Sequence, residues 1–120
     1  MKTETSRSAR VEIIAHRGAS FDAPENTLAA IELAWHQQAD AVEIDVRLTA
    51  DAEIVVIHDE TTARHGGRDT PVCEESLTEL RQIDVGRWKG SQWAGERIPT
   101  LAEVLETVPD GKRLFVEIKC

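Results

Sequence analysis

Apolar residues occupy every second position of the stretch 41–47, and the polar positions between them hold Glu43, Asp45 and Arg47. A period of two residues is typical of a β-strand with one apolar face. The two carboxylates therefore point to the same side, where their charges repel each other unless a cation or a proton lies between them. The pattern predicts a strand that carries either a cation site or a solvated acidic edge.

Three further short runs have the composition of strands, at residues 11–15, 54–57 and 114–119. The first two are followed by histidines, His16 and His58. The last run alternates polar and apolar residues as the central run does. The chain is therefore expected to contain four strands.

Three segments predict helices, at about 26–38, 76–83 and 100–107. Asn26 is the predicted N-cap of the first helix. The other two helices each begin with the Ser/Thr-x-x-Glu pattern of a capping box. Residues 60–97 are mostly polar and rich in glycine, and they are too long for an ordinary connection. We expect them to form an inserted loop or lid.

Strands that alternate with helices predict an α/β protein with a parallel sheet. In such folds the functional groups collect at the carboxyl ends of the strands. The ionisable residues at or near these ends are His16, Arg17, Glu43, Asp45, His58, Glu117 and Lys119. The other two histidines, His36 and His65, are expected on the surface. Four strands that bring ionisable side chains to one edge indicate a functional site rather than a solvated face.

The chain has 120 residues, which suffice for one small domain with a moderate core. It is 41% hydrophobic and 30% charged, as soluble globular proteins are. A net charge of −8 without a basic cluster argues against nucleic acid and anionic membranes as partners. Residues 1–10 are expected to be a loose tail without a signal sequence, and no run has transmembrane length. Two cysteines fit a reducing compartment, so we expect a cytoplasmic protein without stable membrane insertion.

Glu43, Asp45 and Glu117 would form a site of hard oxygen ligands, which favours Mg²⁺, Ca²⁺ or Mn²⁺ over zinc or copper. Arg17 and Lys119 are donors suited to a phosphate group. The two histidines at the strand ends are suited to act as general base and general acid. Together these residues predict metal-assisted cleavage of a phosphodiester.

The sequence resembles the glycerophosphodiester phosphodiesterase family from residue 12 onward. The motifs that carry the resemblance are Ile14-Ala15-His16-Arg17-Gly18-Ala19, Pro24-Glu25-Asn26-Thr27, Glu43-Ile44-Asp45-Val46, His58-Asp59, Arg97-Ile98-Pro99-Thr100-Leu101 and Glu117-Ile118-Lys119. The resemblance implies that residues 11–120 are the N-terminal half of a TIM-type (β/α)₈ barrel. They would hold its first four strands, with residues 60–97 as an insertion after the third.

The resemblance also implies a function, the hydrolysis of small glycerophosphodiesters, which are deacylated phospholipids, to sn-glycerol 3-phosphate and an alcohol. The resemblance implies that Glu43, Asp45 and Glu117 hold one divalent cation, which would be Mg²⁺ or Ca²⁺, with Mn²⁺ as a third option. It implies acid–base catalysis by His16 and His58. It also implies phosphate contacts from Arg17 and Lys119. Two alternatives stay open. One is a phospholipase D-like enzyme that cyclises its substrate, and the other is a non-catalytic metal- or ligand-binding module.

Four residues near these motifs have two interpretations each. Glu25 either reaches the metal region or supports the first helix. Asp59 is expected to orient the preceding histidine or to close the turn rather than to bind metal. Trp88 and Trp93 either form a lid over the substrate headgroup or pack the insertion onto the barrel.

A (β/α)₈ barrel needs about 250 residues, roughly twice the length of this chain. A half barrel leaves open strand edges, which favour pairing with another chain. We therefore expect one of three situations: a fragment of a longer enzyme, two copies that combine into one assembly, or an ordered but inactive fragment.

Overall fold

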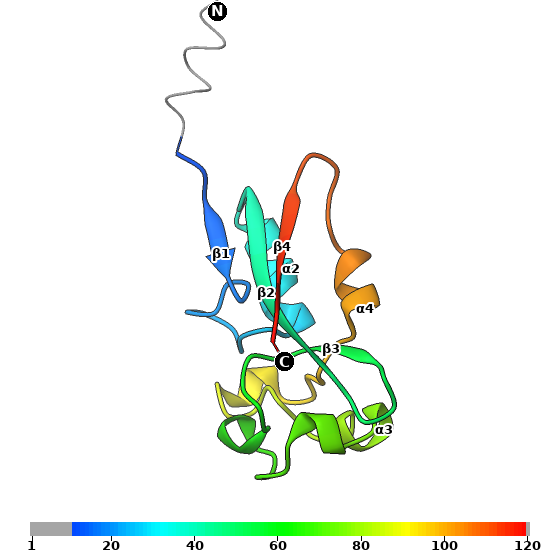
Figure 1. Ribbon diagram of the computed structural model, residues 1–120. Helices are drawn as coiled ribbons and strands as arrows, with labels where there is room; N and C mark the ends of the chain where they lie inside the picture. The colour runs from blue at the N-terminus through cyan, green and yellow to red at the C-terminus, as the bar shows by residue number, and fades with distance from the viewer. Residues whose placement is uncertain (1–10, 120) are drawn as a thin grey trace, which may run out of the picture.

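The computed structural model describes residues 11–119, so the predicted tail at residues 1–10 lies outside the described residues. The strands are β1 (Ile14–His16), β2 (Ala41–Leu48), β3 (Ile54–Val56) and β4 (Arg113–Ile118), all in one sheet (Figure 1). The helices are α2 (Leu28–His36), α3 (Leu77–Leu80) and α4 (Leu101–Leu105), with short 3₁₀ helices η1 (Ala63–His65), η2 (Val72–Glu74) and η3 (Ser91–Trp93). Between β3 and α4, the connecting segments gather at the carboxyl ends of β2 and β4 (Figure 1).

The sheet is parallel in three of its four strands. β1 and β4 both run parallel to the central strand β2, as predicted. β3 runs antiparallel to the end of β2, with Val56 opposite Val46, so the prediction of a parallel sheet is wrong for this strand, which is not one of the parallel barrel strands as predicted. The reason is the short connection over residues 49–53, because a parallel crossover needs a dozen or more residues.

β3 lies on the same side of β2 as β1. The carbonyl oxygens of Glu43 and Asp45 accept hydrogen bonds from the N–H groups of Arg17, which follows β1, and Ile57, which follows β3, at 2.6 and 2.9 Å. The carbonyl of Val46 points to the other side, where it accepts a bond from Lys119. The segments that follow β1 and β3 therefore flank the same stretch of β2.

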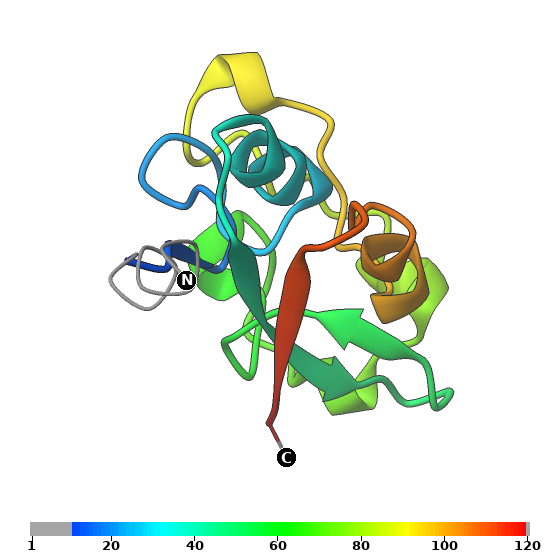
Figure 2. The same ribbon diagram turned by 90° about the horizontal axis from the view of Figure 1, so that it is seen from above.

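The apolar residues of β2 form the core against two helices. Val42, Ile44 and Val46 are buried, and they pack with residues of α2 and of α4. Figure 2 shows both helices on one side of β2 and β4. Burial of each such apolar side chain contributes roughly 1.5–3 kcal/mol to the free energy of unfolding. Because one face of β2 is buried in this way, its alternate polar residues must point to the opposite face.

The two predicted capping boxes are confirmed. The Ser76 hydroxyl accepts from the Glu79 N–H while the Glu79 carboxylate accepts from the Ser76 N–H, and Thr100 and Glu103 make the same pair of bonds. The helices that they begin are shorter than predicted, since α3 spans four residues and α4 five.

The predicted N-cap of the first helix is wrong. The cap of α2 is Thr27, whose hydroxyl accepts a hydrogen bond from the Ala30 N–H. Asn26 has a left-handed backbone with a φ of 59°, so it cannot take the extended cap conformation. Its side chain is used at the site instead. Within residues 11–119, no helix is long and apolar enough to cross a membrane.

Candidate active site

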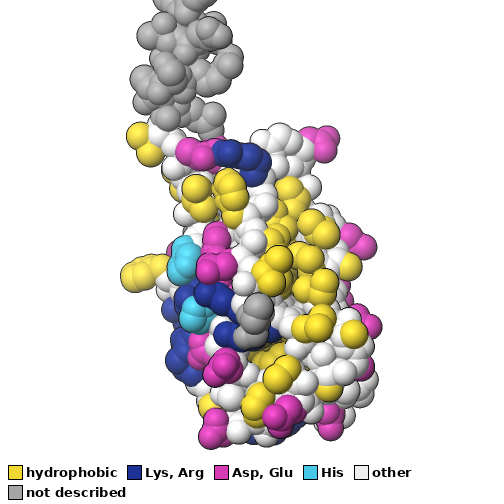
Figure 3. Space-filling view, in the orientation of Figure 1, with side chains coloured by type: hydrophobic (Ala, Val, Ile, Leu, Met, Phe, Trp, Pro, Cys, Tyr) yellow, Lys and Arg dark blue, Asp and Glu magenta, His cyan; other side chains and the backbone are white. Residues whose placement is uncertain are grey.

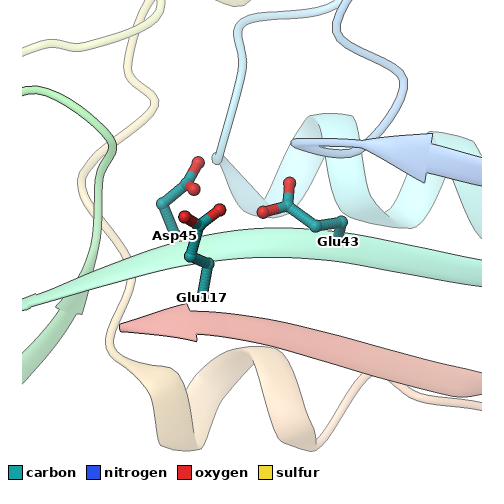
Figure 4. Close-up of side chains that lie close together, drawn as sticks. All are labelled: Glu43, Asp45 and Glu117. Atoms are coloured by element: carbon teal, nitrogen blue, oxygen red, sulfur yellow. The ribbon is translucent and has the colours of Figure 1, made fainter. Parts of the chain in front are cut away.

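Three carboxylates meet on the polar face of the sheet. Glu43 and Asp45 project from β2, and Glu117 projects from β4, where it lies opposite Asp45 in the parallel register. One oxygen from each side chain lies within 4.8 Å of the others (Figure 4). The structure therefore brings together the three residues predicted as metal ligands.

The acidic cluster fits a divalent cation. Asp45 is 1% exposed, and Glu43 Oε1 is buried and accepts no hydrogen bond from any residue that the structure describes. Burial raises the pKa of Glu43 above its ordinary value, and the charge of Asp45 raises it further. Carboxylates crowded together in this way are stabilised by a positive charge between them, and three oxygen ligands match a hard cation such as Mg²⁺, Ca²⁺ or Mn²⁺.

Asn26 holds Asp45 in place through two hydrogen bonds. Its Nδ2 donates to Asp45 Oδ2 at 3.1 Å, and its Oδ1 accepts from the Asp45 N–H at 3.4 Å. The N–H of Asn26 itself donates to the carbonyl of Arg17. Asparagine is one of the few non-glycine residues that adopt left-handed backbone readily, which suits it to this turn. The sequence did not predict this role for Asn26, because an asparagine before a helix more often indicates an N-cap.

Arg17 reaches the acidic cluster from the turn that follows β1. Its Nε lies 3.3 Å from Asp45 Oδ2, and one terminal nitrogen lies 3.3 Å from Glu25 Oε2. The turn continues with Gly18 at a φ of 80°, where a Cβ atom would lie 2.7 Å from the carbonyl carbon of Ala30. The Nε of Arg17 is buried, and its contact with Asp45 Oδ2 is an ion pair rather than a well-directed hydrogen bond.

Glu25 supports Arg17 and lies outside the acidic cluster. Its Oε2 contacts Arg17, Arg64 and His65 at 3.3, 2.9 and 3.5 Å. Burial favours the neutral acid, but contacts with His65 and Arg64 outweigh this effect and lower the pKa of Glu25 to about 2. The carboxylate therefore stays ionised and holds the guanidinium of Arg17 beside Asp45.

The prediction that His65 is a surface residue is wrong, whereas His36 is exposed as expected. His65 is only 4% exposed, because the insertion folds back over Glu25 and thereby encloses the His65 side chain. Its ring meets the edge of Trp88 at 5.2 Å between centroids, and Trp88 also donates a hydrogen bond to the carbonyl of Val85. These contacts favour the interpretation that Trp88 packs the insertion.

His58 is held from two directions after the end of β3. Its Nδ1 lies 3.0 Å from Asp59 Oδ1, as expected for an orienting residue. Bonds from Arg64 hold the pKa of Asp59 well below its usual range, so the carboxylate is an acceptor and Nδ1 of His58 carries the proton. Arg47 donates from two nitrogens to the backbone carbonyl of His58, at 2.9 and 2.7 Å. This role of Arg47 follows from its place on the same face of β2 as the two carboxylates.

His16 and Lys119 complete the site at the ends of β1 and β4. The side chain of His16 is 65% exposed, and its Nε2 lies 3.5 Å from Glu43 Oε1. Lys119 donates to Glu117 Oε2 at 3.0 Å. Figure 3 shows basic, acidic and histidine side chains gathered on one part of the surface, beside a field of hydrophobic ones. Every residue predicted for the site thus lies on or next to the acidic cluster or on the neighbouring loop after β3.

Comparison with solved structures places this sheet within a known barrel. An Oleispira antarctica phosphodiesterase, in complex with the product sn-glycerol-3-phosphate, superimposes with a TM-score of 0.86 and 42% identity, over 95% of this chain and 47% of that one. A glycerophosphodiester phosphodiesterase from Agrobacterium tumefaciens gives 0.87 and 39%, over 92% of this chain and 48% of that one. The family's solved structures are TIM barrels, which confirms the expected fold class.

Sequence comparison identifies the family. A curated relative from Caldanaerobacter subterraneus subsp. tengcongensis, named glycerophosphodiester phosphodiesterase, is 47% identical over 108 residues. The match takes in 89% of this chain and 44% of the relative, so the chain spans about half the length of such relatives. The family model described as the glycerophosphoryl diester phosphodiesterase family matches residues 16–120. The chain therefore belongs to the glycerophosphoryl diester phosphodiesterase family.

Proposed function

We propose that this chain carries the metal- and phosphate-binding part of an enzyme that hydrolyses glycerophosphodiesters to sn-glycerol 3-phosphate and an alcohol. The observation that carries the proposal is the convergence of three carboxylates beside the guanidinium of Arg17. The Oleispira relative, which binds sn-glycerol-3-phosphate as product, supports the same class of substrate.

Glu43, Asp45 and Glu117 would hold one divalent cation, Mg²⁺ or Ca²⁺. A bound cation of this kind polarises a phosphoryl oxygen and neutralises charge that develops during displacement at phosphorus. Asn26 fixes the orientation of Asp45 before any ligand arrives, so that little reorganisation is needed on binding.

Arg17 binds a non-bridging oxygen of the phosphate through its guanidinium group, and Lys119 adds a second positive charge from the end of β4. The positively charged groups of Arg17 and Lys119 both lie next to carboxylates, which keep them in place while the site is empty of substrate. Their charges offset the negative charge of the whole protein at the point where an anion must bind.

His16 and His58 exchange protons with the reacting oxygens. In the first displacement, one histidine takes the proton from a glycerol hydroxyl of the substrate as that oxygen bonds to phosphorus, and water later opens the resulting cyclic phosphate to glycerol 3-phosphate. The other donates a proton to the leaving alkoxide oxygen as its bond to phosphorus breaks. Because Asp59 accepts the Nδ1 proton of His58, the ring's Nε2 is the nitrogen left for this transfer.

The proposed activity is tested by measuring release of glycerol 3-phosphate from glycerophosphocholine by the 120-residue chain, with EDTA and then with Mg²⁺ or Ca²⁺ restored. We expect activity that depends on the ion. His16→Ala should lower it by about 100-fold or more, because the exposed side chain has a chemical rather than a packing role. His36→Ala, at another exposed position, on α2, is the matched control.

Other outcomes of this experiment point to the alternative functions. Tight binding of the ion without turnover would indicate a non-catalytic module. A cyclic phosphate product from lysophospholipids would indicate the cyclising enzyme. Equal activity of the His16→Ala variant and the unchanged chain would contradict the role assigned to this histidine.

We also propose that the open side of β4 binds another copy of the chain. Ile118 is 77% exposed, Val116 is 38% exposed, and both line an apolar groove of about 540 Å³ with residues of β2 and β3. Within residues 11–119 β4 pairs only with β2, so its outer edge is open. An open edge beside apolar surface favours association.

A cytoplasmic location is part of the same proposal. Cys73 is exposed and forms no disulfide with any residue from 11 to 119, which suits a reducing compartment. Cell fractionation would test this location.

A further inference from the structure

Arg64 connects two carboxylates that come from different parts of the chain. It lies in η1, and its guanidinium donates to both oxygens of Glu25, at 3.2 and 2.9 Å. The same group donates to both oxygens of Asp59, at 2.9 and 3.1 Å. A planar guanidinium has five donors in a fixed fork, so it can satisfy two carboxylates at once and fix their relative orientation.

Each of these carboxylates holds a different functional group. Glu25 contacts Arg17, the proposed phosphate ligand, and Asp59 contacts Nδ1 of His58, a proposed acid–base residue. The bonds of Arg64 thus link the phosphate side of the site to the proton-transfer side. The Glu25 side chain is 11% exposed, so without Arg64 the carboxylate would lose two hydrogen bonds that water replaces poorly.

Charge balance also favours a second cation beside Arg17, which is already shared between Glu25 and Asp45. The acidic cluster already concentrates three carboxylates on one face of the sheet, and Glu25 and Asp59 add two more nearby. The bonds to Asp59 and Glu25 raise the pKa of Arg64 above its already high value, so it stays charged. Removing this charge would let Glu25 and Asp59 repel each other and turn away from Arg17 and His58.

We propose that Arg64 is a positioning residue that sets the orientation of Arg17 and of His58 together. This inference rests on the proposed function for the roles of those two residues. Arg64 does so through carboxylates and does not touch the acidic cluster. The role follows from the fold-back of the insertion, which brings residue 64 against residues 25 and 59.

The test compares Arg64→Ala with Arg68→Ala in the 120-residue chain. Arg68 is a matched control, because its side chain is also 46% exposed, lies in the same insertion and pairs with a buried carboxylate, Glu75, away from the site. In the glycerophosphocholine assay, Arg64→Ala should lower kcat/KM about 10- to 100-fold. The loss should be divided between a higher KM, from Arg17, and a lower kcat, from His58. Arg68→Ala should leave both parameters within about twofold.

A second readout does not depend on turnover. Nitrogen NMR of the imidazole rings reports which ring nitrogen of His58 carries the proton. In the unchanged chain and in Arg68→Ala the proton should reside on Nδ1, whereas Arg64→Ala should give a mixture of the two tautomers. Arg64→Lys keeps the charge and serves if the alanine variant does not fold; it should also give a mixture, because an ammonium group lacks the planar fork.

The two readouts separate this proposal from the proposed function. If the unchanged chain lacks activity under every ion, the proposed function of the isolated chain fails, and the NMR comparison still decides the role of Arg64. If the Arg64 variants match Arg68→Ala in the His58 tautomer, the positioning role is overturned, whether or not the chain is active.

Discussion

At the scale of single residues, Asn26 shows how the role of a side chain depends on one backbone angle. The residue precedes a helix, where asparagine is a common cap. Its positive φ turns the side chain away from the helix end and toward Asp45, and the neighbouring threonine takes over the cap. Adjacent residues therefore divide two tasks: Thr27 begins the helix and Asn26 orients a metal ligand.

This division predicts opposite effects of two neighbouring substitutions. Asn26→Ala should weaken binding of Mg²⁺ or Ca²⁺ about 10-fold, because Asp45 loses a partner that orients it. Thr27→Ala should lower the free energy of unfolding by about 1 kcal/mol, because α2 loses its cap, and should leave the ion affinity unchanged. Calorimetric titration with each ion and denaturant unfolding measure the two quantities. The assignment is wrong if Thr27→Ala affects ion binding more than Asn26→Ala does.

At the scale of elements, α4 is tied to α3 through one carboxylate. Glu103 closes the capping box of α4 by accepting from the Thr100 N–H, and both of its oxygens accept from the guanidinium of Arg81 just after α3. The bonds from Arg81 lower the pKa of Glu103 from 4.5 to about 2, with burial acting in the opposite direction. The insertion and the helix that follows it are thereby joined by a charged contact.

The lowered pKa predicts how stability changes with pH. A carboxyl whose pKa is lower in the folded state stabilises the protein above its unfolded pKa, and this contribution disappears as the pH falls through the folded pKa. The contribution of Glu103 should therefore be complete above about pH 5 and lost between about pH 4.5 and 2. Since the side chains of Glu103 and Arg81 are each about one-third exposed, solvent screening limits the contribution of this ion pair to the free energy of unfolding to about 1 kcal/mol.

Denaturant unfolding of Glu103→Gln across this pH range tests the contact. The variant should be less stable than the unchanged chain at pH 7 and should approach it near pH 2. Glu106→Gln, at the exposed end of the same helix, is the control and should follow the unchanged chain at every pH. A constant stability difference for Glu103→Gln from pH 7 to pH 2 would contradict the ionic contribution.

At the scale of the whole molecule, the central fact is a sheet with an open side. The apolar groove beside β4 lies on the surface, while the polar face of the same strands carries the site. The relatives are about twice as long as this chain. A surface of this kind is stabilised when another polypeptide covers it, which is the reason for proposing self-association.

The proposed association predicts that one charge on the groove separates the copies. Ile118→Lys places an ammonium group on the open side of β4, where a partner would have to bury it. Sedimentation at micromolar concentrations should show oligomers of the unchanged chain and monomers of the variant. Phe21→Lys is the control, since Phe21 is 91% exposed on the loop between β1 and α2. A monomeric unchanged chain would overturn self-association.

The local patterns of the sequence determined much of the architecture and of the site. Strict alternation placed Glu43 and Asp45 on one face of a strand, because successive side chains of an extended backbone point to opposite sides. The two Ser/Thr-x-x-Glu patterns located the starts of α3 and α4, since each capping box closes within four residues. These features depend on neighbours in the chain, so they can be read without the fold.

Only the tertiary structure decided the features that depend on distant parts of the chain. It showed that β3 is antiparallel, that His65 is buried against Glu25, and that Arg64 bridges carboxylates 39 and 5 residues away in sequence. Such contacts arise when the insertion packs over the carboxyl ends of the strands. Their partners are chosen by proximity in space, and no period or spacing in the sequence encodes that proximity.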